Sequence, residues 1–472
     1  MSCLIKLQPI DKWAEKEGWI NFNKINFYQK AGLIVLMVSG LFGCGGGGSS
    51  GEVGSASSVN PLATVAQSQL DARAVKIYYS YDFSAEKSKA KNFYSAAYGG
   101  FLTPKADAEL DAAVDELVFA SIQKEVNGDP YRPEVYQLLT PPKKWFGLQV
   151  PGGRYAYDNP DAIYRWIPIS GGERYILRGH RHTNGPSDVT FSLIDNVNSQ
   201  GTINYLSDAD LVIDSNGNYT VTVDSDPANG RINHIRSTSA AVQLFVRNNL
   251  GDWSTQVPDS LAVERISTTA APPAKTDAAI FAAASQALLA GGATYGTYLL
   301  GATTLATPVN TIPVPKVGSG LITQANSFSH FRVADDEALV ITLNAGGAGY
   351  FVVPVTTLWM GSVKPETHQS SLNSSQAIAN ADGTYTFVLS PTDPGIFNWL
   401  DTVGLNEGTI MLRLQRLPLL ATNISVQSRL VKLTELPGIL PAGTRHVSAS
   451  ERQQILASRA AGFARRLAEP IP

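Results

Sequence analysis

Apolar and polar residues alternate with a period of two in two long stretches of this chain. In the first, from about 155 to 266, Tyr175 and Leu177 alternate with Ile176 and Arg178. In the second, from about 327 to 430, the same spacing begins at Leu339, Ile341 and Leu343. Successive side chains of a strand point to opposite faces, so this spacing predicts strands with one buried face. We expect a mainly β fold with two jelly-roll-like β-sandwich lobes.

Helical spacing appears before, between and after these stretches. Leu110, Val114 and Leu117 indicate a helix that ends near Asn127 and Gly128. A Pro-rich boundary then precedes a second helix, for which Thr276 is the predicted N-cap. In the tail, Ser450 and Gln453 are spaced as a capping box, which predicts a third helix.

The two β stretches resemble each other at an offset near 165 residues. "NGNYTVTVDSDPANGRINHIRSTSAAVQLFVR" (216–247) aligns with "DGTYTFVLSPTDPGIFNWLDTVGLNEGTIMLRLQR" (382–416). The matches are Gly217 with Gly383, Tyr219-Thr220 with Tyr385-Thr386, Asp226-Pro227 with Asp393-Pro394, Asn233 with Asn398, and Arg247 with Arg413. Several matches in order favour a duplicated β unit. Chance similarity between hairpins with Asn-Gly and Asp-Gly turns is the alternative.

The second copy carries residues that the first lacks. Trp399 and Asp401 stand where the first copy has His234 and Arg236, and Glu407 has no counterpart. Paired carboxylates can act as acid and base in glycoside cleavage when their separation is suitable. Asp401 and Glu407 are therefore the catalytic candidates, and turn capping is their structural alternative.

Other polar groups are candidates for ligand contact. "YDNPDAIYR" (157–165) contains Asp158, Asn159, Tyr164 and Arg165, which suit either a structural ion pair or a clamp for an acidic or polyhydroxyl ligand. Asn398 and Arg413 are further ligand-binding candidates in the second copy.

His180 and His182 share one face of a predicted strand. Two histidines fall short of the three or four ligands of a typical metal site, so we expect no metal and no cofactor.

The segment before the first helix has the features of an export signal. "AGLIVLMVSGLFGC" (31–44) follows Lys24 and Lys30, is too short to span a bilayer comfortably, and ends in a lipobox-like Leu41-Phe42-Gly43-Cys44. "GGGGSSGEVGSASS" then forms a flexible tether. We expect lipidation at Cys44 and a contact with the lipid bilayer there, with an ordinary secretory signal as the alternative. The polar residues upstream indicate an extended n-region or a start codon assigned too early.

Composition narrows the class of partner. The net charge is −3, with 44% hydrophobic and 16% charged residues, so the chain can bury a core. No basic stripe stands out, which argues against nucleic acid as a partner. The only two cysteines are Cys3 and Cys44, so a lipidated Cys44 would leave no thiol nucleophile and no disulfide in the mature protein.

Three segments also carry a family resemblance. "NPDAIYRWIPISGGERYILRG" (159–179), "NADGTYTFVLSPTDPGIFNWLDTVGLNEGTIMLRLQ" (380–415) and "VSASERQQILASRAAGFARR" (447–466) resemble the bacterial family called domain of unknown function 1214, over about residues 74–466. The resemblance implies a jelly-roll-like sandwich with helical additions in exported bacterial proteins. It implies no established activity and assigns no catalytic residue.

These observations predict a division of the chain and a function. We expect a signal peptide (1–43), a tether (44–70), a mixed helical region (71–150), a first lobe (151–268), a connector (269–326), a second lobe (327–432) and a helical tail (433–472). Gly45 after Cys44 favours the outer membrane, by resemblance to proteobacterial lipoproteins. The leading hypothesis is a protein that binds a carbohydrate or another small envelope-accessible ligand between the lobes. The alternatives are a carbohydrate hydrolase or lyase, or a structural envelope protein.

Overall fold

The computed structural model describes residues 60–100, 102–145, 147–318, 320–418 and 423–468. The predicted signal peptide, and Cys44 with the tether up to residue 59, lie outside the described residues. Within them the chain is mainly β, with two sandwich lobes and helices before, between and after the strands, as the sequence predicted.

The first lobe packs a five-stranded sheet on a four-stranded one. The larger sheet has the order β1 (Tyr136–Leu138), β4 (Ala162–Pro168), β10 (Gln243–Asn249), β6 (Asp188–Ile194) and β7 (Thr202–Ser207). The smaller has the order β11 (Ser260–Arg265), β5 (Tyr175–His180), β8 (Asn218–Asp224) and β9 (His234–Arg236). Their facing side chains, among them Leu177, Phe191, Val221 and Leu244, form one apolar core.

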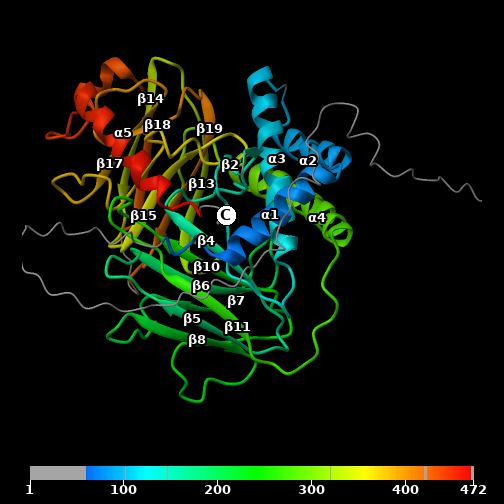
Figure 1. Cartoon of the computed structure of the whole chain (residues 1–472). Coiled ribbons are helices and arrows are strands. Elements are labelled where there is room, and N and C mark those ends of the chain that lie inside the picture. The colour runs from blue at the N-terminus through cyan, green and yellow to red at the C-terminus, as the bar shows by residue number, and fades with distance from the viewer. Residues whose placement is uncertain (1–59, 101, 146, 319, 419–422, 469–472) are drawn as a thin grey trace, which may run out of the picture. The chain divides into compact units, whose positions relative to one another are not determined.

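The second lobe has the same plan (Figure 1). Its larger sheet has the order β12 (Lys316–Val317), β13 (Gln324–Arg332), β19 (Glu407–Gln415), β15 (Tyr350–Thr356) and β16 (Ser371–Asn373). Its smaller sheet has the order β18 (Trp399–Asp401), β17 (Tyr385–Ser390), β14 (Glu337–Asn344) and β20 (Ser425–Lys432). Its core includes Ile341, Phe387, Ile410 and Leu412.

Strand order and local bonding agree between the lobes. Each smaller sheet contains one parallel pair, β8 with β9 and β17 with β18, at corresponding places. Asn233 and Asn398 precede these short strands and act alike. The Asn233 side chain makes two hydrogen bonds to the backbone of Val212. Its Oδ1 accepts from the Val212 amide at 2.8 Å, and its Nδ2 donates to the Val212 carbonyl at 2.7 Å. Asn398 repeats both bonds with Ile378, at 2.9 and 2.7 Å. The predicted relation between the lobes is therefore present in the structure.

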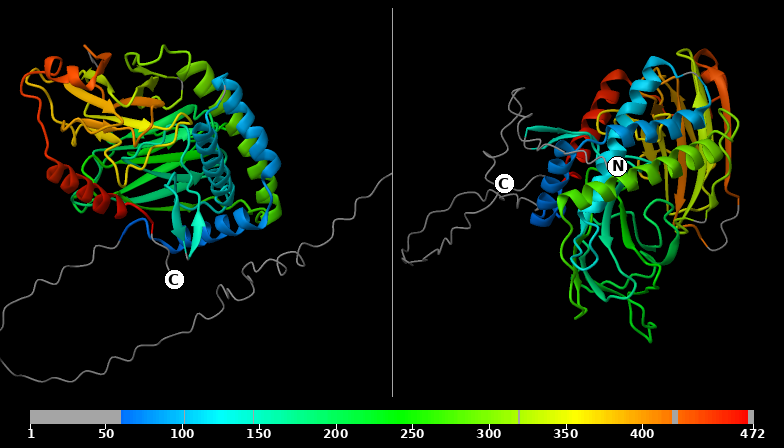
Figure 2. Two further views of the ribbon diagram at one scale, coloured as in Figure 1. Left: turned by 90° about the horizontal axis from the view of Figure 1, so that it is seen from above. Right: turned by 90° about the vertical axis from the view of Figure 1, so that its right-hand side faces the viewer.

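The helices before and between the lobes form one layer. They are α1 (Val65–Ser80), α2 (Ser84–Tyr98), α3 (Pro104–Val126), α4 (Asp277–Gly292) and the π-helix η3 (Ala293–Thr304). The α4 helix begins at the predicted cap, where the Thr276 hydroxyl accepts from the Ala279 amide. In both views of Figure 2 the green α4 lies beside the blue helices. A hairpin of β2 (Lys143–Trp145) and β3 (Leu148–Val150) follows β1.

By length and composition alone, the continuous helix 277–304 is apolar enough to cross a membrane. One face of it packs inside the fold, where Ile280, Ala284, Leu288 and Leu300 join a core with residues of α2 and α3. The packing gives its apolar character a structural reason.

The tail contains the 3-10 helix η4 (Leu433–Gly438) and α5 (Ala449–Ala464). The capping prediction at Ser450 is wrong by two residues. Ser448 is the N-cap, and its hydroxyl accepts from the Glu451 amide at 3.2 Å. Ser448 and Glu451 have the same i, i+3 spacing, so the pattern fits both positions. The buried residues of α5 include two arginines, Arg452 and Arg459, together with Phe463, and Arg466 is buried just beyond the end of the helix.

Candidate functional site

A cavity of about 500 Å³ lies between the two five-stranded sheets, on the faces turned away from the sandwich cores. Leu244 and Val246 point into the first core, so Phe245 and Arg247, which alternate with them, face the cavity. Met411 and Arg413 face it from β19 in the same way. The volume is in the range of small-molecule sites. Its walls include Tyr155, Tyr157, Tyr164, Tyr295, Tyr298, Phe245, Phe328, Asn326, Gln324, Arg247 and Arg413.

The two arginines occupy equivalent places in the two lobes. Arg247 lies opposite Tyr164 in the β10–β4 register, and Arg413 lies opposite Asn326 in the β19–β13 register. Both arginines are buried, with exposed fractions of 3% and 5%. The duplication therefore delivers one guanidinium group from each lobe to the same cavity.

Arg247 makes hydrogen bonds to neutral groups. Its Nε donates to the Thr190 hydroxyl at 3.1 Å, and its Nη1 donates to Gln324 Oε1 at 2.6 Å. Its Nη2 donates to the Thr323 hydroxyl at 2.5 Å. Burial lowers the pKa of Arg247, and the positive charge of Arg413 lowers it further.

Arg413 is less well satisfied. Its Nη2 donates to the backbone carbonyl of Tyr157, while its Nη1 is buried without a hydrogen-bond partner among the described residues. The Oδ1 of the neighbouring Asn326 is also buried and unpartnered there. Buried polar atoms without partners are costly, so both atoms mark a place where a ligand would supply the missing bonds.

Carboxylates lie nearby but accept no hydrogen bond from either arginine. Asp158 lines the cavity, yet its oxygens accept from the Ser362 amide at 2.8 Å and hydroxyl at 2.6 Å. Asp188 accepts from the amide groups of Asn249 at 2.8 Å and Gln415 at 3.0 Å. Burial raises the pKa of both acids. Arg154 and, less strongly, Arg413 oppose the rise in the pKa of Asp158, and Arg247 opposes it in Asp188. The carboxylates thus moderate the positive charge from a distance and leave guanidinium donors facing the cavity.

One wall is a backbone segment in an unusual conformation. Ala156 and Tyr157 both have positive φ angles, +49° and +66°. Side chains other than glycine rarely adopt this region, and such strain gathers at ligand sites. The Tyr157 amide donates to the Met360 carbonyl at 2.8 Å, and its hydroxyl lies 2.7 Å from the Thr304 hydroxyl. These bonds to the second lobe and to η3 hold the segment in place.

The structure brings four of the predicted ligand residues to this cavity, namely Asp158, Asn159, Tyr164 and Arg413. The Tyr164 hydroxyl accepts from the Asn159 amide at 2.8 Å. Asn159 Nδ2 donates to the Tyr350 hydroxyl of the second lobe at 2.9 Å. Two of the four therefore form one bonded group, which connects to the second lobe.

The other two ligand candidates lie elsewhere. Arg165 follows Tyr164 in β4 and so points to the opposite face, where it donates to the Asp259 carbonyl and Asn248 Oδ1. Asn398 anchors the chain before β18 through its bonds to Ile378, and its Nδ2 also contacts the Thr386 carbonyl at 3.1 Å.

The two catalytic candidates occupy different environments. Asp401 is buried at the end of β18, and its Oδ1 accepts from the Val403 amide at 2.7 Å. Burial raises the pKa of Asp401. Glu407 begins β19, lies 3.3 Å from Arg332 in an exposed ion pair, and lines a separate pocket of about 220 Å³ with Glu109. Asp401 does not line that pocket.

His180 and His182 are adjacent, with ring centroids 4.9 Å apart. His180 contacts Asn218 Oδ1 and His182 contacts the Ser260 hydroxyl, each at 3.0 Å. Among the residues that the structure describes, no group of three or more His, Cys, Asp or Glu side chains gathers as metal ligands. The absence of a metal stays a prediction.

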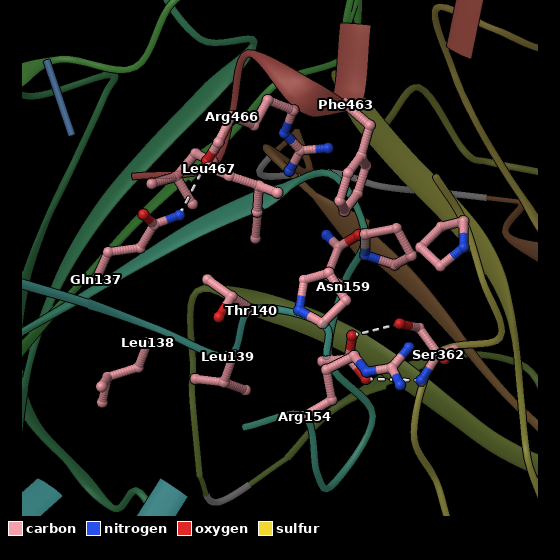
Figure 3. Close-up of a pocket in the computed structure, with 16 residues that line it drawn as sticks. Gln137, Leu138, Leu139, Thr140, Arg154, Asn159, Ser362, Phe463, Arg466 and Leu467 are labelled. Atoms are coloured by element: carbon pink, nitrogen blue, oxygen red, sulfur yellow. Dashed lines mark hydrogen bonds between the residues drawn. The ribbon is translucent and has the colours of Figure 1, made fainter. Parts of the chain in front are cut away.

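A much smaller pocket, about 20 Å³, adjoins the cavity. Figure 3 shows it between Gln137, Arg154, Asn159 and Arg466. Gln137 Nε2 donates to the Arg466 carbonyl at 3.0 Å, which holds the end of the tail against the first lobe. This volume is near that of a single water, so the pocket is a packing gap between the tail and the lobes.

Several cavity residues were not singled out from the sequence as site residues. In the sequence, Arg247 stands out only as a match between the two copies, and Tyr155, Tyr295 and Asn326 do not stand out. A signal was present for Arg247 and Arg413. A charged residue between the core-facing apolar positions of a strand, at the same place in both copies, is costly to bury unless the face it points to has a polar role.

Comparison with known proteins shows that this chain is similar in fold to a solved structure. No family model matches the chain, and no curated protein matches it. The fold is similar to the crystal structure of an uncharacterized protein from Burkholderia cenocepacia, with a TM-score of 0.65 and 22% identity, over 77% of this chain and 100% of that one. The VPA0106 protein from Vibrio parahaemolyticus is less similar, with a TM-score of 0.38 and 11% identity over 73% and 100% of the two chains. The Burkholderia likeness concerns the fold alone, and the resemblance to domain of unknown function 1214 stays a prediction.

Proposed function

We propose that this chain is a binding protein for a carbohydrate or another small ligand, held in the cavity between its two β-sandwich lobes. The observation that carries the proposal is the cavity of about 500 Å³ with a buried arginine from each lobe. Small-molecule sites combine apolar and aromatic walls with a few placed polar groups. Here Tyr155, Tyr164 and Phe245 supply the aromatic surface.

The rim of the cavity supports access from solvent. Tyr298 on η3 is 66% exposed, and Ser199, in the turn between β6 and β7, is also exposed. Buried arginines below an exposed rim favour a ligand that enters the cavity.

The binding test blocks the rim. Ser199→Trp would place a large ring at the entrance, and Ser239→Trp, at an exposed position that does not line the cavity, is the matched control. The purified protein is screened by calorimetry against neutral sugars, sugar acids and sugar phosphates. We expect at least one ligand to bind the parent and the control equally, and Ser199→Trp about tenfold more weakly. Equal binding to both variants, or no binding within the panel, would contradict the proposal.

Export and anchoring form a second part of the proposal. The lipobox-like end at Cys44 and the glycine tether support a lipid-anchored protein of the bacterial envelope, in the outer membrane. Mass spectrometry of the mature N-terminus is the test. We expect a lipid-modified Cys44, and Cys44→Ala should leave the protein unprocessed or released from membranes. An unmodified Cys44 in a soluble product would refute the anchor.

A further inference from the structure

We infer that the ligand carries an anionic group, a carboxylate or a phosphate, that Arg247 and Arg413 hold together. This inference rests on the proposed binding function and adds the chemical class of the ligand. It also implies that the group beside the anion bears a hydroxyl, for which Asn326 Oδ1 is the acceptor.

The hydrogen bonds of three other buried or half-buried arginines support this assignment. Arg154 pairs with Glu116 at 2.6 Å, Arg181 with Asp259 at 2.5 Å, and Arg452 with Asp393 at 2.9 Å. Each of these guanidinium groups donates directly to a carboxylate. Arg247 and Arg413 are buried more deeply than Arg154 and Arg181, and they donate to no carboxylate among the described residues.

The place of these arginines in the fold argues against a purely structural role. Arg165, Arg459 and Arg466 also lack an ion pair within 4 Å, but they do not line the cavity, and Arg459 and Arg466 lie over the ring of Trp253. Arg247 also lies 5.9 Å from the ring centroid of Phe245, but Arg247 and Arg413 both line the cavity. Two like charges at one cavity repel each other, and an anion between them removes that repulsion and accepts their free N–H groups. Arginine suits carboxylates and phosphates because its planar fork donates two bonds at once.

The positions of Arg413 Nη1 and Asn326 Oδ1 indicate where the hydroxyl group of the ligand would bind. Arg413 Nη1 and Asn326 Oδ1 are unpartnered on neighbouring strands, directly opposite each other in the β19–β13 register. The first atom is a donor and the second an acceptor. A ligand with an anionic oxygen for Arg413 and an adjacent hydroxyl for Asn326 satisfies both, and sugar acids and sugar phosphates have this combination.

The first experiment uses inorganic phosphate, so the rest of the ligand, beyond its anionic group, need not be known. The melting temperature of the purified protein is compared in sodium phosphate and sodium chloride at equal ionic strength. We expect phosphate to raise it by about 2 °C or more, because an anion that binds the folded state stabilises it. Arg247→Gln and Arg413→Gln should each remove at least half of the shift, and the double variant nearly all of it.

Two further variants serve as controls for misfolding and for the loss of an unrelated arginine. Arg413→Lys keeps the charge and should keep part of the shift, even if Arg413→Gln folds poorly. Arg178→Gln removes an exposed arginine that pairs with Glu264 at 2.7 Å, and should keep the full shift. An equal shift in the double variant would show a general salt effect and overturn the inference, as would the absence of any shift.

The second experiment separates this inference from the binding function and compares the two anion types. Glucuronate, glucose 6-phosphate and glucose are titrated into the protein by calorimetry. We expect one acidic sugar to bind at least about tenfold more tightly than glucose, and Arg413→Gln to abolish that preference. If all three bind equally and Ser199→Trp weakens all three, the cavity binds sugars but the anion assignment is wrong. If none binds and phosphate gives no shift, both proposals fail.

Discussion

Lys124 lies buried in α3 inside a group of aromatic rings. Its Nζ is 4.3 Å from the ring centroid of Tyr155, 4.8 Å from Trp166 and 5.9 Å from Tyr295. Burial lowers the pKa of Lys124 to about 7. The unfolded chain has a lysine pKa near 10.4, so between about pH 7 and 10 the unfolded state binds one more proton. Stability should therefore rise with pH across this window, by up to about 1.4 kcal/mol per unit.

Lys124→Met removes this titration while keeping an unbranched side chain. We expect the variant to gain most stability below pH 7, where the burial penalty on the charge is fully present, and to lose the rise above pH 7. Urea unfolding at pH 6.5 and 9.5 measures both effects, with Lys316→Met at an exposed position as the control. A pH dependence that is the same in Lys124→Met and the parent would show that another group titrates.

Trp399, at the start of β18, anchors this strand to the end of β17. It is 6% exposed, its Nε1 donates to the Ser390 carbonyl and hydroxyl at 3.1 Å each, and Arg452 lies 5.0 Å from its ring centroid. We expect Trp399→Ala to lower the free energy of unfolding by about 3 kcal/mol or more. Asp401→Asn should cost little, since an amide oxygen can still accept from the Val403 amide. Chemical denaturation measures both, and a Trp399→Ala loss below about 1 kcal/mol would refute the anchoring role.

At the scale of elements, the hydrophobic periodicity predicts the strands but not all of the helices that pack around them. The period of two locates β5, β8, β14 and β19, because each has one face in a core. It also explains why Tyr164 reaches the cavity and Arg165 cannot. A helical region is expected over 71–150, but α1 and α2 are not distinguished within it, because few apolar residues mark their buried faces. The buried residues of α1 include Gln67 and Asp71, and α2 buries only Ala90 and Tyr94.

Close approach of two elements is invisible in the sequence, and Gly462 in α5 is an example. A Cβ added there would lie 2.7 Å from the carbonyl oxygen of Trp253. We expect Gly462→Ala to destabilise the protein by about 2 kcal/mol, although alanine favours helices by about 1 kcal/mol over glycine. Ser458→Ala, at an exposed position of the same helix, should be nearly neutral. Thermal unfolding compares them, and stabilisation by Gly462→Ala would show that α5 can move away from Trp253.

At the scale of the molecule, the sequence indicates the duplication but not the place where the two copies meet. Arg247 and Arg413 align at the sequence level, yet nothing in a one-dimensional pattern says that their sheets face each other. The structure shows that the larger sheets of the two lobes face each other, because residues at equivalent places in the two copies are in contact. Asn249 Nδ2 donates to Gln415 Oε1 at 2.9 Å, and these residues end the matching strands β10 and β19. The cavity is thus a product of how the lobes pack.

Asp161 joins the two lobes through buried hydrogen bonds, so its surroundings test whether the lobes unfold as one. It is fully buried in the first lobe and accepts from Tyr350 Oη at 2.6 Å and Asn373 Nδ2 at 2.8 Å, both in the second. Tyr350→Phe would leave a buried carboxylate short of one donor, at a cost of about 2 kcal/mol. If the lobes form one cooperative unit, β10 and β19 should lose amide hydrogen-exchange protection equally, since both open only by global unfolding.

Tyr385→Phe, in β17 and away from this junction, serves as the control and should change the exchange of neither strand. Loss of protection confined to β19 would mean that the second lobe opens alone. The cavity walls would then separate without global unfolding, and ligand entry would need no path through the rim at Ser199.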